Sequence, residues 1–227
     1  MDSARYHIQF GNINIGAANI SSSEAKLSTT LGQLAANKFD SSGYIVKAGF
    51  QYIHSIIPFR FSISKTSIDF NTLIPDTPSE VVATFSAYFG AAGQYQITAA
   101  EEGTLQTLSS SSIVDTSCNG GGQTCNETTP AVWDSTSAHG FGYSMLVPGD
   151  DIPTSFTDCY NNNGSKQCYR PFPNLLAPTP ETPAVVMSSV NVGKNRQAII
   201  RFKANVSGTQ ESGSYQTIIS FVATPTY

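Results

Sequence analysis

Apolar and polar residues alternate along most of this 227-residue chain, which is the pattern of β-strands with one buried face. Residues 5–15, "RYHIQFGNINI", are the first example, because Tyr6, Ile8 and Phe10 would lie on the same face of a strand. Residues 43–53, "GYIVKAGFQYI", alternate in the same way. The pattern predicts a strand in each of these two stretches.

A boundary is predicted at Pro58, because proline is excluded from central strands. Beyond it, short alternating segments recur between turn signals, the spacing typical of an antiparallel sandwich. The strands predicted there cover residues 59–64, 67–75, 80–89, 93–105, 139–147, 184–192, 196–207 and 213–227. We therefore predict an all-β fold. Residues 59–227 would form an antiparallel β-sandwich, and residues 1–58 an N-terminal strand segment, either integrated into the sheet or exchanged.

One stretch has helical spacing instead. In Ser22 to Ala36, "SSEAKLSTTLGQLAA", Leu27, Leu31 and Leu34 recur at three- and four-residue intervals. Gly32 and the Ser/Thr run disfavour a helix, but this is the best helical candidate in the chain.

The last fifteen residues, "GSYQTIISFVATPTY", predict a closing strand. Tyr215, Ile219 and Phe221 would share its buried face, and Pro225 would end the ladder. The segment opens with Gly-x-Tyr-Gln, as do residues 93–98, "GQYQIT". Similar sequence requirements at the start of two strands explain this repeated motif better than duplication of a segment does.

The four cysteines form two close pairs, Cys118 with Cys125 and Cys159 with Cys168. Local pairing loses the least loop entropy, so two loop disulfides are favoured over cross-paired or free thiols. Six and eight intervening residues fit zinc-ligand spacing poorly. Disulfides indicate an oxidising compartment. The first residues are too polar for a signal peptide, so we expect an extracellular or cell-surface protein whose signal peptide has been removed. A protein that is cytosolic from its first residue would fit the same polar start.

The amino-acid composition limits the kinds of partner that this protein could bind. Charged residues make up 12% of the chain, so the polar surface must come largely from its 29 Ser, 22 Thr and 14 Asn. Such surfaces are common in secreted β proteins. The net charge of −4 is spread thinly, which argues against nucleic-acid binding. No apolar stretch reaches 18 residues, so membrane insertion is not expected.

The sequence shows no catalytic constellation, and we expect neither catalysis nor a cofactor. The three histidines lie in three different predicted strand regions, namely His7, His54 and His139. Neighbouring residues of a strand point to opposite faces, so the acidic pairs at residues 101–102 and 150–151 do not form facing carboxylates. Calcium at "PGDDIP" (148–153) with Asp158 is an alternative, but a polar turn is favoured and no metal site is predicted.

Aromatic residues near the cysteine loops are candidates for glycan stacking, namely Trp133, Tyr143, Tyr160 and Tyr169. If the two loops meet at one end of the sandwich, these rings would form a binding edge. For Trp133 and Tyr143 a position in the core is the favoured interpretation, because aromatic side chains dominate cores.

Several segments resemble known proteins. Residues 67–105, "SIDFNTLIPDTPSEVVATFSAYFGAAGQYQITAAEEGTL", resemble a pattern common in secreted bacterial surface domains. The closing "GSYQTIISFVATP" resembles the last strand of WxL-type wall-associated domains and of spore-coat-like and pilin-like β-sandwiches. Residues 27–53 look like the leader region of uncharacterised secreted surface proteins. The resemblance implies an extracellular, non-catalytic surface protein.

The leading hypothesis is a secreted structural or adhesive surface protein, with a fibre or surface layer as its assembly. Its partners would be copies of itself or other surface proteins. Tyr6, Ile8 and Phe10 would add a strand to a neighbour, with the final strand as the receiver. Pairing of this segment within its own chain is the favoured alternative. A carbohydrate-binding module that recognises glycans through the loop aromatics is the second hypothesis, and a hydrolase is the third.

Overall fold

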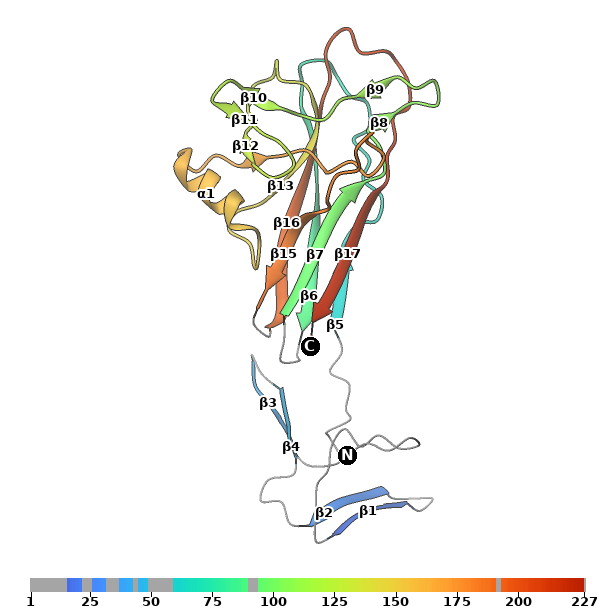
Figure 1. The fold of residues 1–227 in the computed structure, drawn as a ribbon, viewed down its shortest axis with the longest axis vertical. Helices are drawn as coiled ribbons and strands as arrows, with labels where there is room; N and C mark the ends of the chain where they lie inside the picture. The colour runs from blue at the N-terminus through green and yellow to red at the C-terminus, as the bar shows by residue number, and fades with distance from the viewer. Residues whose placement is uncertain are drawn as a thin grey trace. The chain divides into compact units, whose positions relative to one another are not determined.

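The computed structural model describes residues 16–21, 26–31, 37–42, 45–48, 59–89, 94–190 and 193–226. The chain divides into two compact units, Met1–Pro58 and Phe59–Tyr227. Within the described residues strands predominate and α1 (Thr154–Asn162) is the one α-helix, so the predicted all-β class is confirmed (Figure 1).

The first unit contains two antiparallel strand pairs. Strand β1 (Gly16–Ser21) pairs with β2 (Lys26–Leu31), and β3 (Asn37–Asp40) pairs with β4 (Ile45–Ala48). The predicted donor segment around Tyr6 lies outside the described residues.

The helix predicted from Ser22 to Ala36 is wrong where the structure describes it, because Lys26–Leu31 is a strand. The four-residue spacing of Leu27 and Leu31 caused the error, since it fits one face of a helix and one face of a strand equally well. The intervening Ser and Thr residues have low helix propensity, and β-branched Thr favours strands.

The second unit contains two main sheets, both antiparallel. The four-stranded sheet has the order β13 (Gly140–Met145), β16 (Gly193–Asn205), β6 (Ser79–Phe89) and β5 (Phe59–Ile63). The three-stranded sheet has the order β15 (Ala184–Ser189), β7 (Gln94–Glu101) and β17 (Ile219–Thr226).

Rings from these two sheets contact each other. Phe85 of β6 and Phe221 of β17 have centroids 5.0 Å apart, and Phe59 of β5 lies 5.8 Å from Tyr95 of β7. The alternation predicted from the sequence determines which side chains take part. In β16, for example, the inward residues are all buried, namely Ala198, Ile200, Phe202 and Ala204.

The strand predicted over residues 67–75 is wrong, because this stretch forms no strand and contains only an isolated bridge at Ile74. The closing strand is shorter than predicted: it begins at Ile219, so Tyr215 precedes it. Pro225, which was predicted to end the ladder, lies within β17 opposite Tyr95.

Short strands and the helix build the end of the unit that carries the cysteines. The minor strands are β8 (Leu105–Gln106), β9 (Ser112–Ile113), β10 (Cys118–Gly120), β11 (Gln123–Thr124), β12 (Ala131–Val132) and β14 (Cys168–Tyr169). Both predicted disulfides are present, Cys118–Cys125 (the first staple) and Cys159–Cys168 (the second staple).

The sequence reasoning missed helix α1 inside the second staple. Pro153 immediately before it and the Asn-Gly after it are the usual start and stop signals of a helix. Among the described residues, no helix has both the length and the apolar character needed to span a membrane.

Candidate functional site

The two stapled loops meet. Gln123 Nε2 in the first loop donates to Asn163 Oδ1 in the second at 2.9 Å. Strands β12 and β14 pair between the loops, and Lys166 bonds Asp134 at 2.8 Å. These contacts join the two loops into one rigid element at this end of the unit. We call residues 118–134 and 159–169, which contain both staples, the cap.

Three of the four rings predicted as stacking candidates lie inside this structure. Trp133, Tyr143 and Tyr169 are 1%, 0% and 4% exposed, while Tyr160 on α1 is partly exposed. The indole N–H of Trp133 donates to the Ala138 carbonyl at 2.9 Å. The three buried rings offer no open face on which a sugar could stack, and Trp133 and Tyr143 occupy the core positions that the sequence favoured.

A lysine that the sequence reasoning missed explains how these rings are arranged. The Lys203 ammonium lies 4.9 Å from the Trp133 ring centroid and 4.8 Å from that of Tyr169. It donates to the Trp133 carbonyl at 2.6 Å, and Glu80 Oε1 lies 3.6 Å away. Burial lowers the pKa of Lys203, and the Glu80 charge opposes that shift. Such cation–π contacts stabilise the cap internally.

Arg170 forms a second buried cation centre. Its Nε donates to the Tyr143 hydroxyl at 2.7 Å and a terminal nitrogen donates to the Val185 carbonyl at 2.7 Å. The guanidinium carbon lies 4.9 Å from the Phe156 ring of α1. Burial raises the pKa of Tyr143. Arg170 thus ties the helix and the three-stranded sheet to β13.

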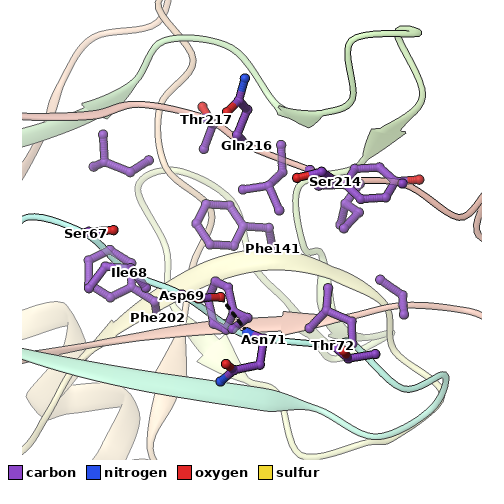
Figure 2. Close-up of a pocket in the computed structure, with 18 of the residues that line it drawn as sticks. Ser67, Ile68, Asp69, Asn71, Thr72, Phe141, Phe202, Ser214, Gln216 and Thr217 are labelled. Carbon is purple, nitrogen blue, oxygen red and sulfur yellow. Dashed lines mark hydrogen bonds between the residues drawn. The ribbon is translucent and has the colours of Figure 1, made fainter.

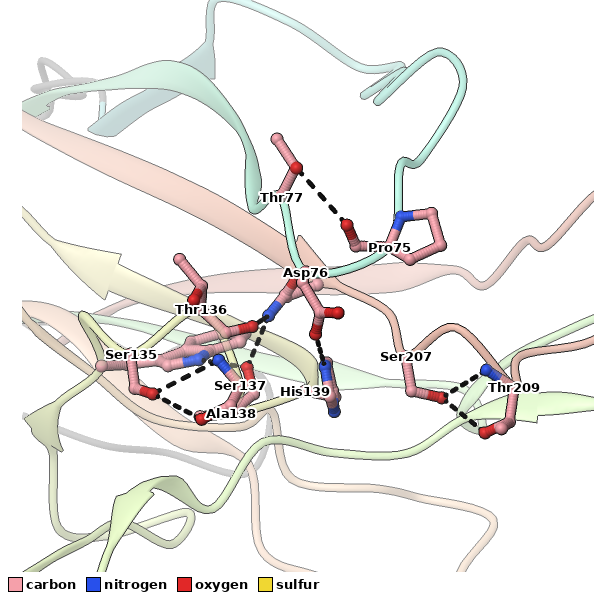
Figure 3. Close-up of polar contacts among 12 residues, drawn as sticks. Pro75, Asp76, Thr77, Ser135, Thr136, Ser137, Ala138, His139, Ser207 and Thr209 are labelled. Atoms are coloured by element: carbon pink, nitrogen blue, oxygen red, sulfur yellow. Dashed lines mark hydrogen bonds and ion pairs between the residues drawn. The ribbon is translucent and has the colours of Figure 1, made fainter.

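Among the polar residues weighed as catalytic or metal-binding candidates, His139, Asp150 and Asp151 have structural partners, whereas His7 and His54 lie outside the described residues. His139 Nε2 lies 2.7 Å from Asp76 Oδ1 at the surface (Figure 3). Asp150 accepts the Gln197 N–H at 2.9 Å, and Asp151 accepts the Tyr95 hydroxyl at 2.6 Å. No cluster of three metal-ligating side chains occurs among the residues that the structure describes.

One acidic contact was not predictable from neighbouring residues. Glu101 is buried and Glu102 exposed, as expected for adjacent strand positions. Glu101 faces Asp115, and burial raises the pKa of Glu101 to about 9 and that of Asp115 to about 6, with the charge of a neighbouring carboxylate adding to each shift. The two carboxyls therefore share a proton near neutral pH.

The second unit contains a groove of about 1060 Å³. One wall is residues 63–75, which follow β5, and the other is residues 206–221, which lead into β17. Figure 2 shows Phe141 between the walls. Phe202, Leu105 and Ile113 also line the opening. We call this opening the edge groove.

Among the described residues, the backbone beside the edge groove has no partner on its outer side. The Glu102 N–H donates to the Ile218 carbonyl at 2.8 Å, and hydrogen-bonded pairs alternate along an antiparallel ladder. Even-numbered residues of β17 therefore bond to β7, and the odd-numbered ones, including Phe221 and Ala223, direct their N–H and C=O groups away from it. Among the described strands, β17 pairs with β7 alone.

Strand β5 has the same arrangement in the other sheet. The Ser64 N–H donates to the Thr84 carbonyl at 2.9 Å, so the even positions of β5 face β6. Phe61 and Ile63 direct their backbone groups outward. Phe85 contacts both Phe61 of β5 and Phe221 of β17, which places these two edge strands on the same side of the unit.

The opposite edge of the four-stranded sheet is covered. In β13, Tyr143 and Arg170 exchange two backbone hydrogen bonds at 2.8 and 2.9 Å. The Phe141 N–H donates to the Val114 carbonyl at 2.9 Å, and its carbonyl accepts from Thr116 at 2.9 Å. Within the part of the chain that the structure describes, the edge of the four-stranded sheet beside the groove is therefore the one without a partner.

Comparison with known proteins found no relative. No protein-family model, curated protein or solved structure matches this chain. The resemblance to secreted bacterial surface domains stays a prediction.

Proposed function

We propose that this protein is a non-catalytic, extracellular structural or adhesive surface protein whose copies associate through exposed strand edges. The observation that carries the proposal is the pair of edge strands, β5 and β17, on the same side of the second unit. Unpaired strand edges are templates for pairing with another chain, and proteins that do not use them usually cover them. Here the opposite edge, at β13, is covered.

The two staples support the extracellular part of the proposal. Disulfides persist in oxidising compartments, and both close loops at the same end of the unit. They make the cap a rigid element that a surface protein can display. Its buried aromatic rings favour a structural role for the cap over glycan stacking.

The experiment is to measure the mass of the purified full chain over a range of concentrations by size exclusion with light scattering, followed by electron microscopy. The test variant is Ala223→Pro, which removes an outward N–H of β17 but none that bonds to β7. Its matched control is Thr224→Ala, at the next position, where the N–H lies in the ladder and the side chain is exposed.

We expect the wild type and Thr224→Ala to form oligomers or fibres and Ala223→Pro to remain a monomer with an unchanged unfolding midpoint. A wild type that is monomeric at every concentration would contradict the proposal. So would a folded Ala223→Pro variant that assembles like the wild type.

A further inference from the structure

Polar and apolar side chains both line the edge groove, and its own chain covers several of the apolar ones only in part. Ile68 and Leu73 from one wall are half-buried, as are Ile219 and Phe221 from the other. The buried side chains of Phe141, Phe202, Leu105 and Ile113 line the same groove. Completing their burial would gain about 25 cal/mol for each Å² of apolar surface removed from water, so the groove favours an apolar occupant.

The shape of the groove favours an extended chain as that occupant. The open edge of β17 offers N–H and C=O groups at every second residue, directly beside the groove. In β-strand addition, such backbone groups supply affinity through hydrogen bonds, and alternate side chains of the added strand reach the adjoining surface.

We propose that the edge groove receives residues 5–15 of a second copy of this chain as an added strand on β17. This inference rests on the proposed function, association through strand edges, and names the two surfaces that join. Residues 1–15 lie outside the described residues. Their sequence places Tyr6, Ile8 and Phe10 at alternate positions, with His7 and Gln9 between them.

Length and charge both suit this occupant. Eleven residues in a strand span roughly 36 Å at about 3.3 Å per residue. The receiving edge from residue 215 to Ala223, beyond which Pro225 offers no outward N–H, matches nine of them. The groove is bordered by Asp69 and Glu211 against Lys65, a net negative charge that the Arg5 side chain would meet.

A donor segment and a receiving groove on the same chain have a consequence for assembly. A contact between two different surfaces of identical subunits is heterologous, and it generates a ring if the rotation closes or an open filament if it does not. Each added copy would fill one groove and present another. The joint therefore predicts polymers rather than closed dimers.

The test mixes two full-length variants that are each defective in one half of the joint. The donor variant carries Ile8→Asp and Phe10→Asp, and its matched control carries His7→Asn and Gln9→Asn on the other face of the segment. The receiver variant is Ala223→Pro. We expect each defective variant alone to be a monomer. Their mixture should form a 1:1 complex of twice the chain mass that does not extend, because only one intact joint remains.

Three other outcomes would overturn this inference. A donor variant that polymerises like the wild type would overturn this inference while leaving association through strand edges intact. A mixture that remains monomeric while the wild type polymerises would also overturn it. A wild type that is always monomeric, together with a destabilised donor variant, would show that residues 5–15 pair within their own chain and would overturn both proposals.

A second measurement covers the case in which Ala223→Pro does not fold. A labelled peptide of residues 5–15 is titrated into the full-length donor variant, and fluorescence anisotropy reports binding. We expect one site per chain, and at least a tenfold weaker affinity when the peptide itself carries Ile8→Asp and Phe10→Asp. Equal affinity for the two peptides would overturn the inference.

Discussion

Replacing Glu101 by Gln should make the stability of the second unit much less dependent on pH. Glu101 is 0% exposed, and neither of its carboxyl oxygens has a hydrogen-bond donor among the described residues unless the Glu101–Asp115 pair holds a proton. A protonated Glu101 can donate to Asp115, which removes the otherwise unexplained burial of bare carboxylate oxygens. A glutamine amide can make the same donation without ionising.

The size of the effect follows from the shift in pKa. The pKa of Glu101 rises from 4.5 to about 9, chiefly through burial and then through the Asp115 charge. The folded chain keeps a proton that the unfolded chain releases above about pH 4.5, so stability falls as pH rises until about pH 9. At about 1.4 kcal/mol per pH unit, the loss from about pH 5 to about pH 8 is about 4 kcal/mol.

The assay is urea unfolding across this pH range, followed by the fluorescence of the single tryptophan, Trp133. Glu102→Gln is the matched control, since Glu102 is adjacent and exposed. The wild type and Glu102→Gln should lose stability together as pH rises, while Glu101→Gln changes much less. Parallel profiles for the wild type and Glu101→Gln would refute the shared proton, as would a wild type that becomes more stable towards pH 8.

Three further predictions concern packing. Lys203→Met removes the ammonium that bonds the cap and should cost about 2–4 kcal/mol in urea unfolding; a loss below about 1 kcal/mol would contradict its role. Gly142→Ala should cost about 1–3 kcal/mol, because a Cβ there would lie 2.8 Å from the Arg170 carbonyl oxygen, whereas Gly208→Ala meets nothing within 4 Å and should be near neutral. Replacing both cysteines of the first staple by serine should cost about 2.5 kcal/mol in thermal unfolding, and an unchanged midpoint would contradict that.

The strands that could be predicted from the sequence are those in which apolar and polar residues alternate without interruption. Strand β16 alternates over many residues and its inward positions are buried as expected. In residues 215–223 the odd positions are more buried than the even ones, although the strand begins only at Ile219. Side-chain alternation starts before the ladder does, because the backbones of Gln216 and Ile218 already bond to those of Gln106 and Glu102.

The contacts that decide the candidate sites join residues distant in sequence. Lys203 reaches Trp133 across 70 positions, and Glu101 meets Asp115 from a different segment. A lysine or a glutamate in an alternating strand is normally read as an outward residue. Nothing local marks these two as buried, because their partners arrive only when the sheets and the cap pack together.

The register of β17 determines which edge of the strand loses a hydrogen-bond donor at Pro225. A proline that ended the ladder would mark the end of the receiving edge. In the structure it stays in the ladder opposite Tyr95, because its odd position directs the missing N–H away from β7. The proline therefore removes a donor only from the open edge. An added strand can bond to β17 as far as Ala223 but loses its next partner at Pro225, so the open edge is available beside the groove and blocked at its far end.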